Sequence, residues 1–369
     1  PDAADVERAA RLIAQAARPV VICGGGVLIA GAEEALALLA ERAGAIVATT
    51  ISGRGSIADA HPLSLGVVGS NGGTPSTRAV IDEADLIVFV GCRAGSVTTE
   101  RWRHPPPSAT VAHVDVDPDV IGANYRTEAP VVGDAKLALE ALIEELGPCK
   151  ASRDDAEARV RRARAEKFAA FDELAASDAT PILPERFVRE LQHVLPEDVV
   201  VVADPGTPCP YLSAYLRLDR TGRHFFSNRA HGALGYSLSA AVGAQFGRPN
   251  AKIVAVMGDG SFGFTAGELE TVVRLGLPIT FVVLSNAVYG WIKAGQKSGY
   301  GGRYYSVDFS PSDHARIAEA YGVKSWRVTA PRELGEALGA AIRHDGPALV
   351  DVVVQPLHEA RAPVSEWVA

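Results

Sequence analysis

Two side chains that carry oxygen, Asp259 and Asn286, stand at positions where they could bind a divalent cation together. Asp259 follows the continuous apolar run 253–256 and lies between two glycines, which let the backbone turn sharply and approach a ligand closely. Asn286 follows a second apolar run, 279–284. A carboxylate, an amide oxygen and a nearby backbone carbonyl form a set of hard oxygen ligands, which suits Mg²⁺.

The elements around these residues should bring them to one edge of a sheet. The pattern of residues 252–296 predicts a strand, a tight loop, a helix with apolar spacing over 266–275, a second strand and a loop. In such a unit the two strands run parallel, so their C-terminal ends share the edge where open α/β sheets bind ligands. The N–H groups of Gly260 and Ser261 would begin the helix, where a phosphate is favoured.

This arrangement resembles the signature of enzymes that use thiamine diphosphate (ThDP). The signature is Gly-Asp-Gly, a spacer of one helix and one strand, and two asparagines; here Ser285 stands at the first asparagine and Asn286 at the second. The resemblance implies that Asp259, Asn286 and the main chain of Val288 bind Mg²⁺. It also implies cofactor contacts by Gly258, Gly260, Ser261 and Tyr289. The alternative is an ordinary βαβ unit with an Asp-Gly turn.

Two more segments of the second half resemble this family. Gly206 and Thr207 follow the apolar run 199–203 and correspond to the loop that helps to hold the diphosphate. The segment 225–244 is similar to the one that lines the bent cofactor. There the resemblance places Gly232 and Ala233 against the cofactor. It makes Leu234 the apolar wedge between the cofactor's two rings, with a core leucine as the alternative.

His231 stands in the same turn as these residues. A histidine can relay protons because its pKa lies near neutrality, so we expect a catalytic role for His231 beside that of Leu234. A hydrogen-bonded histidine that fills space is the alternative.

Residues 1–148 predict a doubly wound parallel sheet, because apolar strand runs alternate with helical patterns. Three of its strands should end at one edge, at 24–26, 91–93 and 115–117. The dinucleotide fingerprint fails because Ile29 stands where its last glycine is needed. The order of motifs resembles the central domain of acetolactate-synthase-like ThDP enzymes, which holds FAD in some members and the ADP part of CoA in others. A purely structural domain is the alternative.

The chain therefore predicts an α/β protein with two doubly wound domains. We expect a central Rossmann-like domain over 1–148, a linker helix within 149–183, and a pyrophosphate-binding domain with a short tail over 184–369. The linker is indicated by a segment rich in Arg, Glu and Ala that ends at two prolines, Pro181 and Pro184.

The composition narrows the class of protein. Hydrophobic residues make up 47% and charged residues 22% of the 369, which is typical of a globular protein. The net charge of −8, without a basic block, argues against a nucleic-acid partner, and no apolar stretch reaches membrane-spanning length. The four cysteines are scattered without metal spacing, so we expect a reducing cytoplasm.

The resemblance implies a ThDP- and Mg²⁺-dependent enzyme that decarboxylates a 2-oxo acid, joins carbons by carboligation, or does both, like an acetolactate synthase large subunit. Two alternatives are a 2-hydroxyacyl-CoA lyase or oxalyl-CoA decarboxylase-type lyase, and a non-catalytic assembly subunit. The synthases carry a tryptophan that selects the second oxo acid. Gly295 stands at that place here, so that preference is not carried over.

The family's activating glutamate lies in a pyrimidine-binding domain that has no counterpart in these residues. We therefore expect another polypeptide to supply it, with further association into a heterotetramer or a larger assembly. Whether the chain is one subunit of a naturally split enzyme or a fragment of a longer one stays open at this point.

Overall fold

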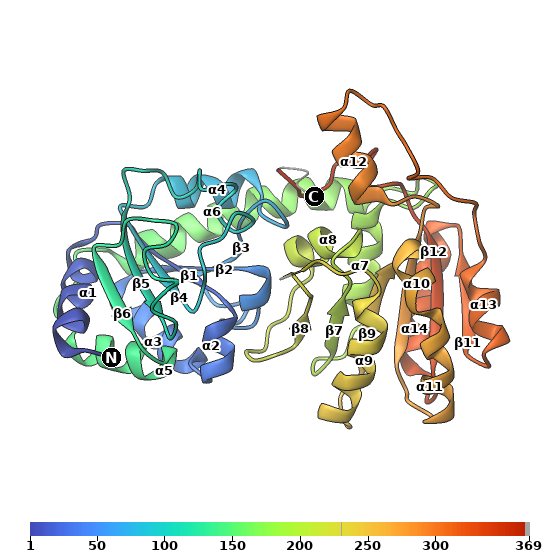
Figure 1. The fold of residues 1–369 in the computed structure, drawn as a ribbon, viewed down its shortest axis with the longest axis horizontal. Coiled ribbons are helices and arrows are strands. Elements are labelled where there is room, and N and C mark those ends of the chain that lie inside the picture. The colour runs from blue at the N-terminus through green and yellow to red at the C-terminus, as the bar shows by residue number, and fades with distance from the viewer. Residues whose placement is uncertain (230, 366–369) are drawn as a thin grey trace. The chain divides into compact units, whose positions relative to one another are not determined.

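The computed structural model describes residues 1–229 and 231–365, which form two compact units (Figure 1). Unit 1 comprises Pro1–Ala169 together with Arg217–Arg223, and unit 2 comprises Ala170–Leu216 and His224–Ala369. The long helix α6 (Arg153–Ala175) contains the boundary between them. It lies where the sequence predicts a linker helix.

Unit 1 is built on a six-stranded parallel sheet with strand order β3-β2-β1-β4-β5-β6. The strands are β1 (Pro19–Cys23), β2 (Ile46–Thr49), β3 (Ser64–Val67), β4 (Leu86–Val90), β5 (Thr110–Asp115) and β6 (Ala129–Val132). Its helices are α1 (Ala3–Gln15), α2 (Gly25–Ala30), α3 (Glu33–Ala43), α4 (Pro75–Asp82) and α5 (Ala135–Glu145), with a 3₁₀ turn η1 (Ile51–Gly53). Every residue of β1 and β4 is buried, as expected of central parallel strands.

Unit 2 contains a second six-stranded parallel sheet with strand order β11-β12-β10-β9-β7-β8. The strands are β7 (Val200–Ala203), β8 (Phe225–Phe226), β9 (Ile253–Gly258), β10 (Thr280–Ser285), β11 (Lys324–Val328) and β12 (Ala348–Val353). The α-helices are α7 (Pro184–Val194), α8 (Pro208–Tyr215), α9 (Tyr236–Gly247), α10 (Asp259–Thr265), α11 (Leu269–Arg274), α12 (Gly290–Gly299), α13 (His314–Ala320) and α14 (Leu334–Arg343). Two 3₁₀ turns, η2 (Ala266–Glu268) and η3 (Pro331–Glu333), complete the set.

The strand order of unit 2 reverses direction between β7 and β9. The chain passes from β7 outward to β8, then returns to β9 on the other side of β7 and continues to β10. Open α/β sheets bind ligands at the carboxyl ends of the strands at such a reversal. Asp204, which follows β7, and Asp259, which follows β9 and begins α10, therefore lie at the expected ligand crevice.

The predicted fold class, two doubly wound parallel sheets, is confirmed. Some local predictions differ from the structure. The segment 266–275, expected to be one helix, forms η2 and α11. A separate helix, α10, precedes it, so Asp259 already lies in the first turn of a helix. The glycines 24–26, read as a strand tip, begin α2.

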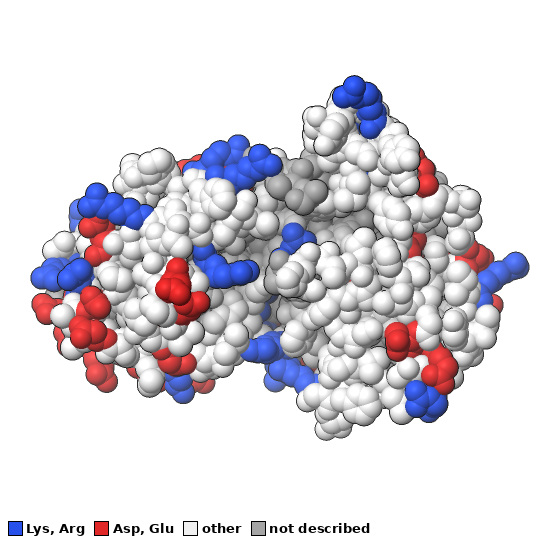
Figure 2. Space-filling view, in the orientation of Figure 1, with Lys and Arg blue, Asp and Glu red and all other residues white. Residues whose placement is uncertain are grey.

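Among the described residues, no helix is both long and apolar enough to cross a membrane. Acidic and basic side chains are interspersed on the face shown in Figure 2.

Candidate functional site

Asp259 joins the ends of two neighbouring strands of unit 2. Its Oδ2 accepts hydrogen bonds from the backbone N–H groups of Asn286 at 2.7 Å and Ala287 at 2.6 Å, and its Oδ1 accepts one from Gly260 at 2.8 Å. Asp259 is buried. Burial raises the pKa of its carboxyl, and the three N–H donors oppose this rise without cancelling it. The structure thus brings Asp259 and Asn286 together at one sheet edge.

The amide of Asn286 is buried without a hydrogen-bond partner among the described residues. This holds for both its Oδ1 and its Nδ2. A buried polar group left in this state costs about 1–3 kcal/mol, so such groups are rare and call for an explanation. A ligand that binds the amide oxygen would provide one.

The backbone of the two residues after Asn286 is held in a defined conformation. Ala287 adopts a left-handed backbone conformation with φ of 56°, and its carbonyl accepts a hydrogen bond from Phe309. Val288 is buried and forms an isolated antiparallel bridge with Asp308. This backbone is therefore fixed from both sides.

A second buried carboxylate, Asp204, organises the crevice from the β7 side. Its Oδ1 accepts a hydrogen bond from the hydroxyl of Ser261 at 2.7 Å, and its Oδ2 accepts from the N–H groups of Gly235 at 3.0 Å and Ser237 at 3.3 Å. Burial raises the pKa of this carboxyl, and these donors oppose the rise. Asp204 therefore fixes the turn before α9 against the first turn of α10.

That turn places Leu234 over the loop after β7. A Cβ atom added to Gly206 would lie 3.4 Å from Leu234 Cδ2, and one added to Gly290 would lie 3.4 Å from Thr207 Oγ1. Leu234 is 37% exposed although it is a large apolar residue. The expected cofactor residues Gly206, Thr207 and Leu234 therefore lie together, with an apolar side chain left partly open to solvent.

Tyr289 packs directly on Gly260. A Cβ atom at Gly260 would lie 2.6 Å from Cε1 of the Tyr289 ring, so the contact requires glycine. The N–H of Gly260 is engaged by Asp259, whereas sequence reasoning expected it to be available for a phosphate.

The other expected residues differ in their burial. His231 and Ala233 are exposed, and Gly232 has a left-handed φ of 66° in the same turn. Ser261 is buried, and Gly258 precedes α10, where an added Cβ atom would lie 3.9 Å from Thr207 Oγ1. Residue 230, beside this turn, lies outside the described residues.

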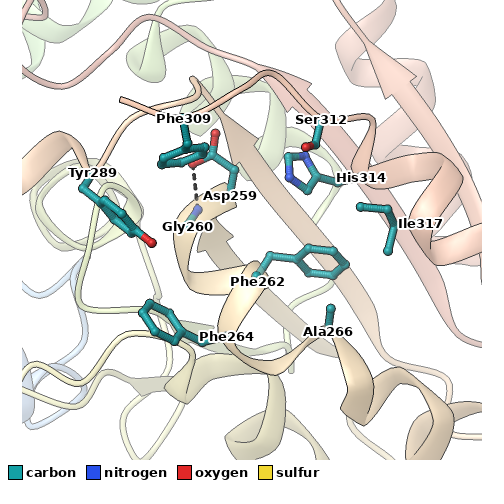
Figure 3. Close-up of a pocket in the computed structure, with 11 residues that line it drawn as sticks. Asp259, Gly260, Phe262, Phe264, Ala266, Tyr289, Phe309, Ser312, His314 and Ile317 are labelled. Atoms are coloured by element: carbon teal, nitrogen blue, oxygen red, sulfur yellow. Dashed lines mark hydrogen bonds between the residues drawn. The ribbon is translucent and has the colours of Figure 1, made fainter. Parts of the chain in front are cut away.

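An open cavity of about 430 Å³ adjoins Asp259 (Figure 3). Tyr289 and Phe309 lie on one side of it, and His314 and Ile317 lie on the other. Its walls are largely aromatic, with Phe262 and Phe264 contributed by α10.

Behind this cavity lies a polar network that sequence reasoning did not find. The hydroxyl of Ser285 contacts His314 Nδ1 at 2.8 Å and donates a short hydrogen bond to Asp351. Asp351 Oδ2 also accepts hydrogen bonds from the backbone N–H of His314 at 3.1 Å and from the guanidinium of Arg327 at 2.6 Å. The network ties Ser285, which directly precedes Asn286, to β11, β12 and α13. In the sequence, this network is indicated only by Asp351, a single carboxylate inside the apolar run 348–354.

The donor set fits a hard cation. In the described part of the chain, no group of three His, Cys, Asp or Glu side chains could hold a metal ion. A cation at Asp259 would therefore depend on amide, carbonyl, water and phosphate oxygens. Mg²⁺ is usually bound in this way, through one or two carboxylates plus waters and substrate phosphates.

Comparison with known proteins agrees with this geometry. The family model described as the thiamine pyrophosphate enzyme C-terminal TPP binding domain matches residues 204–352, and that of the central domain matches residues 6–142. The chain belongs to the thiamine pyrophosphate enzymes and contains these two domains.

The curated relatives include acetolactate synthase large subunits. The chain is 34% identical to a probable acetolactate synthase large subunit of Methanocaldococcus jannaschii and 33% identical to one of Methanococcus aeolicus; each match covers 95% of this chain and 60% of the relative. It is 31% identical to the acetolactate synthase isozyme 3 large subunit of Escherichia coli, with 61% of that protein covered. The chain thus spans about 60% of the length of these relatives.

Proposed function

We propose that this chain provides the cofactor-binding part of a ThDP- and Mg²⁺-dependent enzyme that decarboxylates a 2-oxo acid, joins carbons by carboligation, or does both, in the cytoplasm. The observation that carries the proposal is that the carboxylate of Asp259 lies at one strand edge beside Asn286, whose side-chain amide has no hydrogen-bond partner among the described residues. The acetolactate synthase relatives favour this reaction class over a CoA-dependent lyase.

In this proposal the chain's own groups position the cofactor. Asp259, Asn286 and the carbonyl of Val288 would hold Mg²⁺, and the loop at Gly206 and Thr207 would hold the diphosphate, whose charge the cation would offset. The partly exposed Leu234 supports the bend of the cofactor. When bound, ThDP supplies the nucleophilic carbon and the electron sink, while the protein supplies position and electrostatics.

We propose that the central domain, residues 1–148, has a structural role in unit 1, and that residues 149–183 link it to the pyrophosphate-binding domain, residues 184–369. The strand order of unit 1 also reverses, between β1 and β4, but backbone fills that place. Cβ atoms at Gly24 and Gly26 would lie 2.1 and 2.6 Å from the backbone of Gly91. The glycines are thus explained by packing, and FAD or the ADP of CoA is not needed to explain them.

We further propose that a pyrimidine-binding domain completes the site and carries the glutamate that activates the cofactor. That domain precedes the central domain in the family's usual chain, and the relatives are longer than this chain. It would belong to the same polypeptide or to a partner in a heterotetramer or larger assembly.

The test is CO₂ release from a panel of 2-oxo acids by the protein together with its pyrimidine-binding domain. We expect release that requires both ThDP and Mg²⁺ and that EDTA abolishes. A complete protein that binds ThDP but turns over only 2-hydroxyacyl-CoA esters would contradict the reaction class. Failure to bind ThDP at all would favour a non-catalytic assembly subunit.

A further inference from the structure

Helix α12 begins at the candidate cofactor site and carries two lysines on one face. A Cβ atom at Gly290, its first residue, would lie 3.0 Å from Leu357 Cβ and 3.4 Å from Thr207 Oγ1. Lys293 and Lys297 follow at spacings of three and four residues, so they lie on the same side of the helix as Gly290. Lys293 lies about one turn, about 5 Å along the helix axis, beyond Gly290.

Leu357 and His358, which follow β12, contact this face. Figure 1 shows α12 standing out from the rest of unit 2. Lys297 Nζ donates a hydrogen bond to the carbonyl of His358 at 2.8 Å. The ring of Tyr304 lies 6.0 Å from that of His358 and 4.8 Å from Lys293 Nζ. We call Lys293, Lys297, Tyr304 and His358 the α12–tail cluster.

Lys293 forms an ion pair with an exposed carboxylate. The Lys293 side chain is only 13% exposed, but its partner Asp308, 2.6 Å away, is 62% exposed. Pairs that depend on an exposed carboxylate stabilise little, because water competes for the acid. A second carboxylate arriving at this face can therefore replace Asp308 at small cost.

The cluster also lacks a partner for one buried atom. The side chain of His358 is 8% exposed, and its Nδ1 is buried without a hydrogen-bond partner among the described residues. The pKa of His358 is lowered, first by burial and then by the positive charges of Lys293 and Lys297, although Asp308 and Glu359, whose carboxylate lies 3.5 Å from His358 Nε2, oppose the shift. Two lysines four residues apart on one face repel each other as well. An anion bound here would reduce this repulsion and could accept a hydrogen bond from the imidazole.

We propose that Lys293, assisted by His358, binds the carboxylate of the 2-oxo acid substrate. This inference rests on the proposed function, which requires a carboxylate close to the cofactor. A neutral ligand would gain nothing from the cation, so the cluster selects acids over their amides and aldehydes. The diphosphate of ThDP carries a similar charge, and the experiment below separates the two anions.

The test compares Lys293→Met and Lys293→Arg in the protein with its pyrimidine-binding domain. A charge-assisted hydrogen bond supports a rise of about 10- to 100-fold in the KM for pyruvate in Lys293→Met. We expect a much smaller rise in Lys293→Arg and an unchanged Kd for ThDP in both. Inhibition by pyruvamide, the neutral analogue, should not change. Lys324→Met, on β11 and away from α12, is the matched control. Calorimetric titration of pyruvate into protein loaded with a non-reactive ThDP analogue reads the same site without turnover.

Three results would overturn the inference. They are an unchanged KM in Lys293→Met, an equal loss of affinity for pyruvamide, and a rise in the Kd for ThDP as large as the rise in KM. The last result would assign the lysine to the diphosphate. Each of them can occur while the wild-type protein remains active. Absence of ThDP-dependent turnover in the wild-type protein is a different outcome, which contradicts the proposed function itself.

Discussion

Replacing Asp259 with asparagine should abolish Mg²⁺-dependent binding of ThDP. The carboxylate accepts three backbone hydrogen bonds, and an amide cannot match all three because its NH₂ group would meet an N–H donor. The variant also loses the only charged ligand of the proposed cation. We expect the Kd for ThDP, measured calorimetrically in Mg²⁺, to rise at least about 100-fold. Asp345→Asn, an exposed turn residue of unit 2, serves as the control.

Asn286→Ala separates cofactor binding from folding. The hydrogen bonds to Asp259 come from the backbone at this position, so they survive the change. Removing an unpartnered buried amide should leave the free energy of unfolding unchanged or raise it by about 1 kcal/mol. The affinity for ThDP in Mg²⁺ should nevertheless fall at least about tenfold. A variant that is destabilised and still binds ThDP normally would show that the amide is structural.

The second large effect concerns stability. We expect Asp351→Ala to lower the free energy of unfolding by about 3–5 kcal/mol, because it removes the buried acceptor shared by Ser285, His314 and Arg327 and leaves the buried donors of Ser285 and His314 unpaired. Urea unfolding of the chain measures this change. Asp313→Asn is the control, because Asp313 also faces Arg327, at 3.6 Å, but is half-buried. A loss of less than about 1 kcal/mol in Asp351→Ala would contradict the role of Asp351 as the centre of the network.

The same network gives a pH dependence. Burial raises the pKa of Asp351, but hydrogen bonds from His314 and Ser285 and the charge of Arg327 outweigh it, so the pKa is lowered overall. A group with a lowered folded-state pKa contributes its stability fully above its unfolded pKa of about 3.9 and loses it as the pH falls. The stability difference between wild type and Asp351→Ala should therefore shrink below about pH 4.

The central part of the candidate site could be predicted because its signals are local. Asp259 and Asn286 each follow a buried apolar run directly, and the parallel βαβ rule then brings the two strand ends together. Those rules need no knowledge of side-chain packing. The roles assigned to Gly206, Thr207, Leu234 and His231 stay predictions, although the structure brings the first three together.

The network behind the cavity could not be predicted in this way. Ser285 and Asp351 meet because β10 pairs with β12 in a particular register, with Val283 opposite Asp351. That register is set by the packing of the whole sheet. His314 joins them from the start of α13, after a long loop that has no strong pattern. In unit 1, the glycines 24–26 stand at the expected sheet edge, and backbone packing at Gly91 explains Gly24 and Gly26.

The most direct test of the cation site is anomalous diffraction from crystals of the complete protein grown with ThDP and Mn²⁺ in place of Mg²⁺. We predict one strong peak at about 2.0–2.2 Å from an oxygen of Asp259 and from Asn286 Oδ1. The metal must lie there if the ends of β9 and β10 hold it together with the diphosphate. A ThDP-bound crystal with its peak elsewhere, or with the amide of Asn286 turned away from the metal, would contradict it.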